Sequence, residues 1–380
     1  MSDIRSFVDT IFDELISIRR DIHAHPELGM HEVRTSALIR SELEKMGVDE
    51  IRQPLPTAVV ALIHGKKGPG KCVALRADID ALPIREQADV AWRSLNDGVM
   101  HACGHDVHTA VLMGVLQELN RSRDFEGTLL GLFQPGEECN PGGASLVLAE
   151  EPFAGYDVLA VLGEHVEPQI EVGSLGFRAG KYMAASDELR LHLHGKGGHG
   201  ALRGQLKDPV AAAAECTTRM LALNNEECVL SIGRMEAAGA TNIVPDEAYL
   251  EGTLRTFDER EREIIHRRIA NIAADIDARH GTRTDVDINH GYPCVVNDAI
   301  LVKRAVALAK ALGLGVEMLP LRTTAEDFGF YCKHYPALFY RLGVGHAAGR
   351  SHTATFSPDE GAIDPGIDFM ERLARQILEQ

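Results

Sequence analysis

The segment from Met100 to Ala110 concentrates side chains that bind metals. Its eleven residues, MHACGHDVHTA, include one cysteine, three histidines and one aspartate, and an apolar helical pattern follows. Thiolate, imidazole and carboxylate groups are common protein ligands of first-row transition metals. Cys103 and His105 stand two positions apart, so on an extended backbone their side chains project the same way. The segment indicates a metal site, and a solvated polar loop that is rich in histidine is the alternative.

Polar clusters also follow three short apolar runs that are typical of buried strands. Asp78-Ile79-Asp80 follows residues 73–77, Gly136-Glu137-Glu138 follows residues 128–133, and Gly163-Glu164-His165 follows residues 158–162. In open α/β sheets, ligands bind in the loops beyond the carboxyl ends of the strands. The recurrence of acids and histidines at three such positions therefore indicates a site at one edge of a sheet.

Composition limits the classes of function that remain. The chain of 380 residues exceeds what one hydrophobic core usually holds, so we expect two domains. The formal net charge of −17 opposes binding to a phosphate backbone, and no apolar stretch is long enough to span a bilayer. Seven cysteines scattered through apolar segments are typical of reduced thiols. We expect a cytoplasmic protein that binds neither nucleic acid nor membrane.

Hydrophobic periodicity predicts a discontinuous domain with an insertion. The N-terminus spaces its apolar residues as an amphipathic helix, not as a signal sequence: Ile4, Phe7, Val8, Ile11, Phe12, Leu15 and Ile18. Strand and helix patterns alternate to about residue 180 and resume after about residue 291, which is typical of α/β proteins. Residues 185–290 have the order β-α-β-β-α-β, with Asp208 and Asp258 as helix N-caps. We predict a metal-binding domain, 1–184 with 291–380, and a lid or dimerisation domain at 185–290.

Seven motifs, in order along the chain, carry a resemblance to a known family. They are HAHPELG at 23–29, LRADIDALP at 75–83, HACGHD at 101–106, QPGEE at 134–138, GKGGH at 195–199, NIVP at 242–245 and AEDF at 325–328. Together they resemble the M20 metallopeptidase superfamily, and within it the amidohydrolase branch of hippurate hydrolases, N-acetyldiaminopimelate deacetylases and auxin-conjugate hydrolases. The resemblance implies an α/β fold, with a zinc-exopeptidase-like catalytic domain and an inserted ferredoxin-like (βαββαβ) lid.

The resemblance implies two divalent metal ions per subunit, zinc or manganese, with cobalt and nickel also compatible with the donors. The implied ligands are Cys103, His105, Glu138, His165 and His352. For His165 alone, a satisfied core histidine is the alternative, and the bridging ligand, Cys103 or His105, stays open. We predict that Asp78 and Asp106 orient ligating imidazoles through their other nitrogen. His101 and His108 are expected to support ligands or to begin the helix.

The adjacent pair Glu137-Glu138 bears on the reaction. Neighbouring carboxylates on a loop point in different directions, so we assign Glu138 as a metal ligand and Glu137 as the general base for the attacking water. A solvated acidic turn is the alternative. No Gly-x-Ser-x-Gly elbow supports a serine mechanism. The pair therefore favours amide hydrolysis without a covalent intermediate.

The resemblance also assigns residues of the inserted domain. His199 would stabilise the tetrahedral oxyanion, often from the partner subunit, and Asn242 and Arg255 would grip the carboxylate of the substrate. For Arg255, a surface arginine at a strand end is the alternative. A homodimer or homotetramer is expected. The sequence departs from the family pattern at Cys139, a thiol beside the metals, and at Arg203, which would favour an acidic substrate.

We expect the protein to hydrolyse the amide bond of small N-acyl L-amino acids, N-acetyl or N-aroyl, to a carboxylate and a free amino acid. One alternative is a metal-dependent dipeptidase or carboxypeptidase of the same superfamily. Two alternatives of other classes are a non-catalytic, metal-containing binding protein and a mononuclear structural zinc protein.

Overall fold

The computed structural model describes residues 2–379, and it describes their side chains except for residues 2–11 and Arg203. Helix α1 (Ser2–Ala24) forms at the N-terminus. The side chains of the first four residues of its predicted apolar stripe, from Ile4 to Ile11, lie outside this description. The side chain of Arg203, which was predicted to affect specificity, also lies outside it. None of the helices within the described residues is both long and apolar enough to cross a membrane.

The chain divides into two compact units. Unit 1 comprises the chain up to Gly180, Val296–Pro320 and the chain from Phe330 onward, and unit 2 comprises Lys181–Val295 and Leu321–Gly329. The predicted boundaries lay at 184/185 and 290/291, and residues 321–329 were expected in the other domain. They group with unit 2 because they form backbone hydrogen bonds with the segment at which the chain enters that unit. Ala184 N donates to Arg322 O at 3.0 Å, and Arg322 N donates to Tyr182 O at 2.9 Å.

Unit 1 is built on an eight-stranded mixed sheet. Its strands in spatial order are β1 (Glu50–Arg52), β2 (Val59–His64), β4 (Thr128–Gln134), β3 (Cys72–Asp78), β5 (Val158–Glu167), β16 (Ala337–Gly343), β6 (Ser174–Phe177) and β15 (Gly315–Met318). The four central strands, β4, β3, β5 and β16, run parallel. Strands β3, β4 and β16 are buried along their whole length, which explains their continuous apolar runs.

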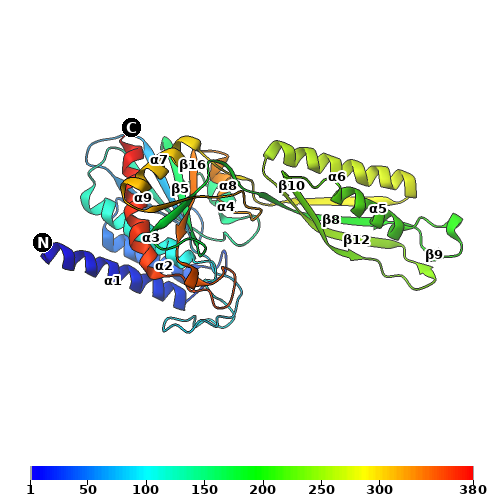
Figure 1. Ribbon diagram of the computed structural model, residues 1–380, viewed down its shortest axis with the longest axis horizontal. Helices are drawn as coiled ribbons and strands as arrows, with labels where there is room; N and C mark the ends of the chain where they lie inside the picture. The colour runs from blue at the N-terminus through cyan, green and yellow to red at the C-terminus, as the bar shows by residue number, and fades with distance from the viewer. Residues whose placement is uncertain (1, 380) are drawn as a thin grey trace. The chain divides into compact units, whose positions relative to one another are not determined.

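Helices flank the sheet of unit 1 (Figure 1). They are α1, α2 (Val33–Met46), α3 (His105–Ser122), α4 (Gly143–Ala149), α7 (Ala299–Ala311), α8 (Gly329–Cys332), which begins in unit 2, and α9 (Ile363–Leu378), with the 3₁₀ turns η2 (His346–Ala348) and η3 (Glu360–Ala362). Helix α3 packs against α1, α9 and β3, and it is buried on nearly all sides. Its first residue, His105, is therefore held inside the protein. Helix α9 begins before the predicted start at Asp364-Pro365, because proline is tolerated in a first turn.

The parallel pairing aligns the ends of the central strands. Asp78 and Gln134, the last residues of β3 and β4, are register partners, so the loops that follow them start side by side. The predicted third loop, Gly163-Glu164-His165, lies instead inside β5. The prediction was wrong because β5 stays paired with β16 as far as Glu167 opposite Gly343. Glu164 and His165 therefore project from opposite faces of one strand.

Unit 2 has the element order β8 (Ala185–His194), α5 (Pro209–Leu221), β10 (Cys228–Glu236), β12 (Glu247–Thr256), α6 (Glu259–His280) and β13 (Arg283–His290). This is the predicted β-α-β-β-α-β order. The strands form an antiparallel sheet in the order β10-β12-β8-β13, with α5 and α6 on one face (Figure 1). Asp208 and Asp258 cap these helices by accepting backbone N–H groups, as expected.

Leucines of β8 and isoleucines of α6 form the core of unit 2 on the helix-covered face. The opposite face of the sheet carries polar side chains. Four short strands and a turn complete the structure: β7 (Gly180–Met183), β9 (Gly198–His199), β11 (Ile243–Val244), β14 (Val295–Asn297) and η1 (Arg203–Gln205).

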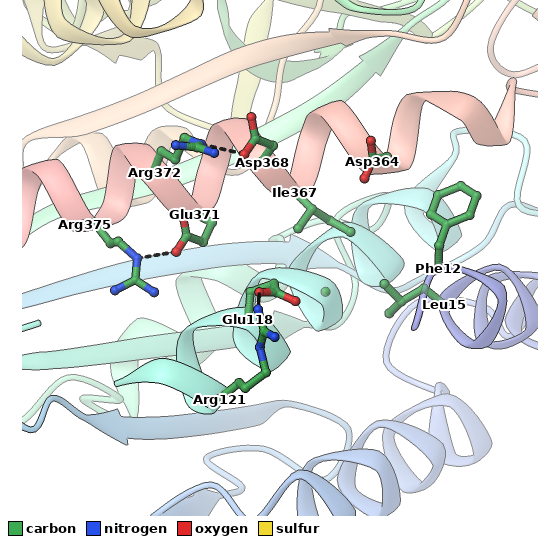
Figure 2. Close-up of a pocket in the computed structure, with 11 residues that line it drawn as sticks. Phe12, Leu15, Glu118, Arg121, Asp364, Ile367, Asp368, Glu371, Arg372 and Arg375 are labelled. Atoms are coloured by element: carbon green, nitrogen blue, oxygen red, sulfur yellow. Dashed lines mark hydrogen bonds and ion pairs between the residues drawn. The ribbon is translucent and has the colours of Figure 1, made fainter. Parts of the chain in front are cut away.

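A hollow of about 450 Å³ lies between α1, α3 and α9 of unit 1 (Figure 2). Phe12, Leu15 and Ile367 form its apolar wall. Its charged side chains pair along their own helix, Asp368 with Arg372 at 2.6 Å and Glu371 with Arg375. None of the residues that line it is a histidine or a cysteine. This hollow therefore lacks the donors of the predicted metal site.

Candidate metal centre

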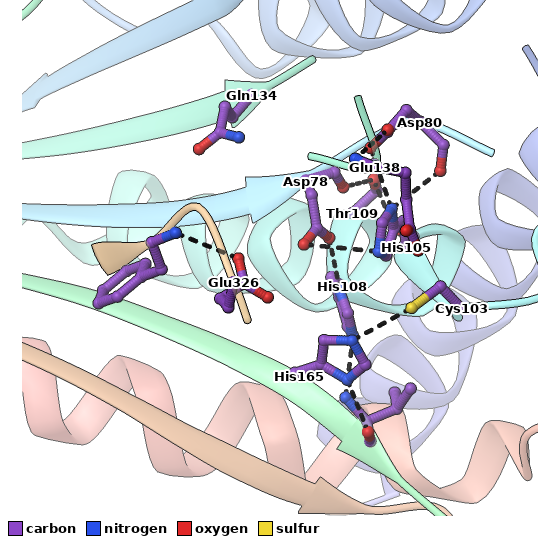
Figure 3. Close-up of polar contacts among 12 residues, drawn as sticks. Asp78, Asp80, Cys103, His105, His108, Thr109, Gln134, Glu138, His165 and Glu326 are labelled. Carbon is purple, nitrogen blue, oxygen red and sulfur yellow. Dashed lines mark hydrogen bonds and ion pairs between the residues drawn. The ribbon is translucent and has the colours of Figure 1, made fainter. Parts of the chain in front are cut away.

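The thiol of Cys103 lies where two groups of potential metal ligands meet. Its Sγ atom is 3.2 Å from Nε2 of His165 on β5 and 3.2 Å from Nε2 of His352 (Figure 3 shows the first contact). Donor atoms of Cys103, His105 and His165 lie within 4.8 Å of one another, and so do those of Cys103, Glu138 and His352. The structure thus brings all five predicted ligands together, with the cysteine common to both groups.

A turn at Gly104 brings Cys103 and His105 together. Gly104 has a φ of +91°, and a Cβ there would lie 2.6 Å from Cγ2 of Val166, so the turn needs glycine. The prediction assumed an extended backbone, and it was wrong because His105 already begins α3. The Nδ1–H of His105 donates to the carbonyl of Asp80 at 2.9 Å. Its buried Nε2 has no hydrogen-bond partner among the described residues, which leaves that atom for a metal.

Hydrogen bonds fix the imidazole rings of His165 on β5 and His108 on α3. His165 donates through Nδ1 to the carbonyl of Val166 at 2.7 Å, so Nε2 faces Cys103 as an acceptor. The Nε2 atom of His108 accepts the Val166 N–H at 2.9 Å, and its Nδ1–H donates to Oδ1 of Asp78 at 2.5 Å. Both nitrogens of His108 are used, so His108 supports the site from outside, as predicted, and is not a ligand.

Glu138 and His352 form the other side of the cluster. Oε1 of Glu138 lies 3.0 Å from Nε2 of His352. The backbone N–H of Glu138 donates to Oδ2 of Asp80 at 2.9 Å, and the N–H of His352 donates to the carbonyl of Ala102 at 2.8 Å. The side chain of His352 is 52% exposed, so this side of the cluster opens to solvent. Glu137, the predicted base, is buried, with 6% of the residue exposed.

The electrostatics of the cluster favour a cation. Hydrogen bonds to Cys103 and Glu138 raise the pKa of His352 to about 10. Burial opposes protonation of His105, but the negative charge of Asp78 and the hydrogen bond to Asp80 contribute to raising the pKa of this imidazole above its usual value. Burial raises the pKa of the Cys103 thiol and lowers the pKa of His165, so His165 is neutral as a ligand must be. A divalent metal would supply the positive charge, and these donors fit one.

Asp80, not Asp78 or Asp106 as predicted from the sequence, orients the imidazole of the candidate ligand His105. Asp80 holds His105 and Glu138, as described above. Asp78 instead holds His108 and ion-pairs with Arg76 at 2.7 Å, although its Oδ2 is 3.6 Å from Nε2 of His105. Asp106 pairs with Arg19 at 2.7 Å and with His23 at 2.8 Å, which fastens α1 to the start of α3. The DID motif contained the signal, since Asp78 is the last residue of β3 and Asp80 follows it.

The predicted residues of the inserted domain lie in unit 2. His199 of β9 pairs with Ile243 of β11, and Gly200 N donates to Asn242 O at 2.9 Å, so His199 and Asn242 are close. Nδ1 of His199 accepts the Ala201 N–H at 3.2 Å, which in the neutral ring places the proton on Nε2, a donor with no acceptor among the described side chains. Arg255 is half-buried near the end of β12, opposite Ser186 of β8.

Cysteine, histidine and carboxylate donors gathered on the mixed α/β fold of unit 1 are typical of a metal-dependent enzyme. The model of the peptidase family M20/M25/M40 matches residues 74–376, and the chain belongs to this family. It is 36% identical to an N-acetylcysteine deacetylase of Bacillus subtilis, over 96% of this chain and 97% of the relative. It is 34% identical to an N-acetyldiaminopimelate deacetylase of Oenococcus oeni, over 94% and 97%. A crystal structure of the Bacillus subtilis YXEP protein, described as a dinuclear metal-binding peptidase from the M20 family, is similar with a TM-score of 0.88 and 34% identity, over 98% of this chain and 99% of that one.

The shared position of Cys103 predicts different metal losses from two substitutions. We expect Cys103→Ala to lose two ions per chain, because its sulfur belongs to both donor groups, and His165→Ala to lose one. Elemental analysis of the dialysed proteins measures this. Cys139→Ala, which removes a neighbouring thiol, is the matched control and should keep both ions. Retention of one ion by Cys103→Ala would show that the sulfur is not shared.

The raised pKa of His352 predicts that metal binding releases protons. Because this pKa is about 10, the imidazole is protonated at neutral pH in the metal-free protein and must lose its proton to bind. Metal affinity should therefore rise with pH up to about pH 10. Calorimetric zinc titrations in buffers of different ionisation enthalpy count the protons, and His352→Gln should release fewer. Heats that do not depend on the buffer would contradict the assignment.

Proposed function

We propose that the protein hydrolyses the amide bond of N-acyl L-amino acids with two divalent metal ions. The observation that carries the proposal is the sharing of Cys103 between two donor groups, in a chain that is 36% identical to an N-acetylcysteine deacetylase. Cys103, His105 and His165 would hold one ion, and Cys103, Glu138 and His352 the other. When bound, the metals polarise the scissile carbonyl and lower the pKa of water from 15.7 to roughly 7.

Glu137 is the general base of this proposal. Its carboxylate is buried and adjoins the ligand Glu138, so little solvent competes for it. The side chain takes the proton of the attacking water and returns it to the leaving nitrogen, which makes the free amine of the product. A base in this position typically contributes about 10²- to 10⁴-fold to the rate. No side chain of the chain needs to bond covalently to the substrate.

Unit 2 supplies the groups that bind the rest of the substrate. The free Nε2–H of His199 has the polarity needed to stabilise the oxyanion of the tetrahedral state. Arg255 has no salt-bridge partner in the described part of the chain, and burial lowers its pKa, so a substrate carboxylate would relieve its desolvation. The exposed Asn242 adds an amide beside His199.

The sheet register separates these groups within one chain. Arg255 is opposite Ser186, whereas His194 is opposite Glu247, beyond which His199 and Asn242 lie. The eight residue steps from Ser186 to His194 span about 26 Å at roughly 3.3 Å per residue. An N-acetyl amino acid is much shorter than this. We therefore propose that His199 and Asn242 act on the substrate of a partner subunit, and that unit 2 serves as both lid and dimerisation domain.

A substrate panel tests the proposed function. The chain, stripped by a chelator and reloaded separately with zinc, manganese, cobalt or nickel, should release free amino acid from N-acetyl or N-benzoyl amino acids. Because the proposed substrates carry an uncharged acyl group where a dipeptide carries an ammonium group, dipeptides should be poorer substrates. Better turnover of dipeptides would support a metallodipeptidase, which the peptidase family also accommodates. Silence with every metal would contradict the proposal.

Glu137→Gln separates catalysis from metal binding in the same assay. It removes the base but keeps the shape of the side chain, so turnover should fall at least 10²-fold while the metal content stays unchanged. Equal turnover of this variant and the native chain would exclude Glu137 as the base.

Mixed oligomers test the contribution of His199 from the partner. Glu137→Gln and His199→Ala chains should each be nearly inactive alone. A heterodimer of the two should regain one working site if His199 acts across the interface, because that site combines an intact Glu137 with the partner's intact His199. Measuring turnover after co-expression with two affinity tags decides this. No gain of activity in the purified heterodimer would show that His199 acts within its own chain.

A further inference from the structure

We propose that unit 2 holds a third metal site, formed by His192, His194 and Glu247 and oriented by Asp285. These residues lie on three adjacent strands of the sheet, β8, β12 and β13, on the face that α5 and α6 leave uncovered. The site is independent of the Cys103 cluster, and its ligand would be a divalent transition metal such as zinc.

The register of the sheet brings the donors together. His192 and His194 are two residues apart on β8, so both imidazoles project from the same face. Glu247 is directly opposite His194 on β12, and Asp285 is directly opposite His192 on β13. Ligand atoms of His192, His194 and Glu247 all lie within 4.8 Å of one another, and the two ring centroids are 4.0 Å apart.

The contacts of each side chain show which of its atoms would bind the metal. The carboxylate of Glu247 faces both imidazoles, with Oε2 at 3.2 Å from Nε2 of His192 and Oε1 at 3.4 Å from Nδ1 of His194. The other nitrogen of His194, Nε2, donates to Oδ2 of Asp285 at 3.0 Å. In the neutral imidazole this hydrogen bond would place the proton on Nε2 and leave Nδ1 as the atom that binds a metal. A carboxylate that holds the second nitrogen of a ligating histidine is a common support of metal sites.

The donor set suits zinc. Two neutral imidazoles and one carboxylate make a His₂Glu set, which binds zinc with a fourth position left for water. The His192 and His194 side chains are 40% and 26% exposed, so a metal could enter from solvent without unfolding the sheet. Asp285 also contacts Arg283 through its other oxygen at 2.5 Å, which fixes its carboxylate. The competing explanation is that protonated histidines merely pair with the two acids.

A metal here would join strands β8 and β12 at the base of the His199 segment. Gly195, next to His194, donates its N–H to the carbonyl of Asp246, next to Glu247. Beyond this link the chain continues to β9 and β11, which carry His199 and Asn242. Occupation of the site would therefore stabilise the end of the sheet from which these two residues project.

Zinc binding to the full-length protein tests the site. After chelation, the native chain and a His192→Gln/His194→Gln double variant are titrated with zinc against a chromophoric chelator, and bound zinc is counted by elemental analysis. We expect the native chain to bind one more zinc ion per chain than the double variant. Asp285→Asn should keep this ion but bind it 10- to 100-fold more weakly, because it only orients His194. His346→Gln, which disrupts the exposed pair of His346 and Glu171, is the matched control and should bind as the native chain does.

Cobalt provides a second measurement that does not depend on activity. Cobalt bound at Cys103 gives thiolate charge-transfer absorption, whereas cobalt bound by imidazole and carboxylate gives only ligand-field bands. The double variant should lose ligand-field intensity and keep the thiolate bands. Equal zinc content and equal affinity in the native chain and the double variant would overturn the proposal, and would show that these histidines serve only as ion-pair partners.

Discussion

The candidate metal centre of unit 1 depends on bringing three other segments of the chain to the sulfur of Cys103. The loop before α3 carries the sulfur, β5 brings His165, the loop after β4 brings Glu138, and the segment after η2 brings His352. Parallel pairing of β3, β4, β5 and β16 makes this convergence possible, because it places these segments at one edge of the sheet. A shift of one residue in the register of β5 would turn His165 to the other face of the sheet.

Hydrogen bonds around the candidate ligands hold each side chain so that one donor atom points toward the cluster. His105 and His165 each donate a hydrogen bond from Nδ1 to a backbone carbonyl, and Asp80 contacts both His105 and Glu138. Burial makes this arrangement costly without a cation, because desolvated thiolate and carboxylate groups lose their hydration. The protonation of His352 compensates for part of that cost in the metal-free protein. The same interactions that orient the candidate ligands would therefore couple metal binding to proton release.

Residue types were easier to predict than their contacts. The five candidate ligands could be named because cysteine, histidine and glutamate recur in recognisable motifs, and the alternation of strands and helices indicated an α/β fold with an insertion. The support from Asp80 could not be separated from that of Asp78, because the choice depends on where β3 ends relative to α3. Likewise, His108 is excluded as a ligand only by the N–H of Val166, a residue far away in sequence. The return of residues 321–329 to unit 2 rests on backbone hydrogen bonds that leave no trace in side-chain pattern.

The strand register of unit 2 separates residues that the sequence motifs only assign to the same domain. The sequence places His199, Asn242 and Arg255 in one inserted domain, and a single substrate could be imagined to contact all of them. The antiparallel pairing of β8 with β12 instead puts Arg255 at the end of the sheet where the chain enters the unit, and the other two beyond the opposite end. Strands are too stiff to fold back over such a length. The proposed contact of one substrate with both ends would therefore require two copies of the unit.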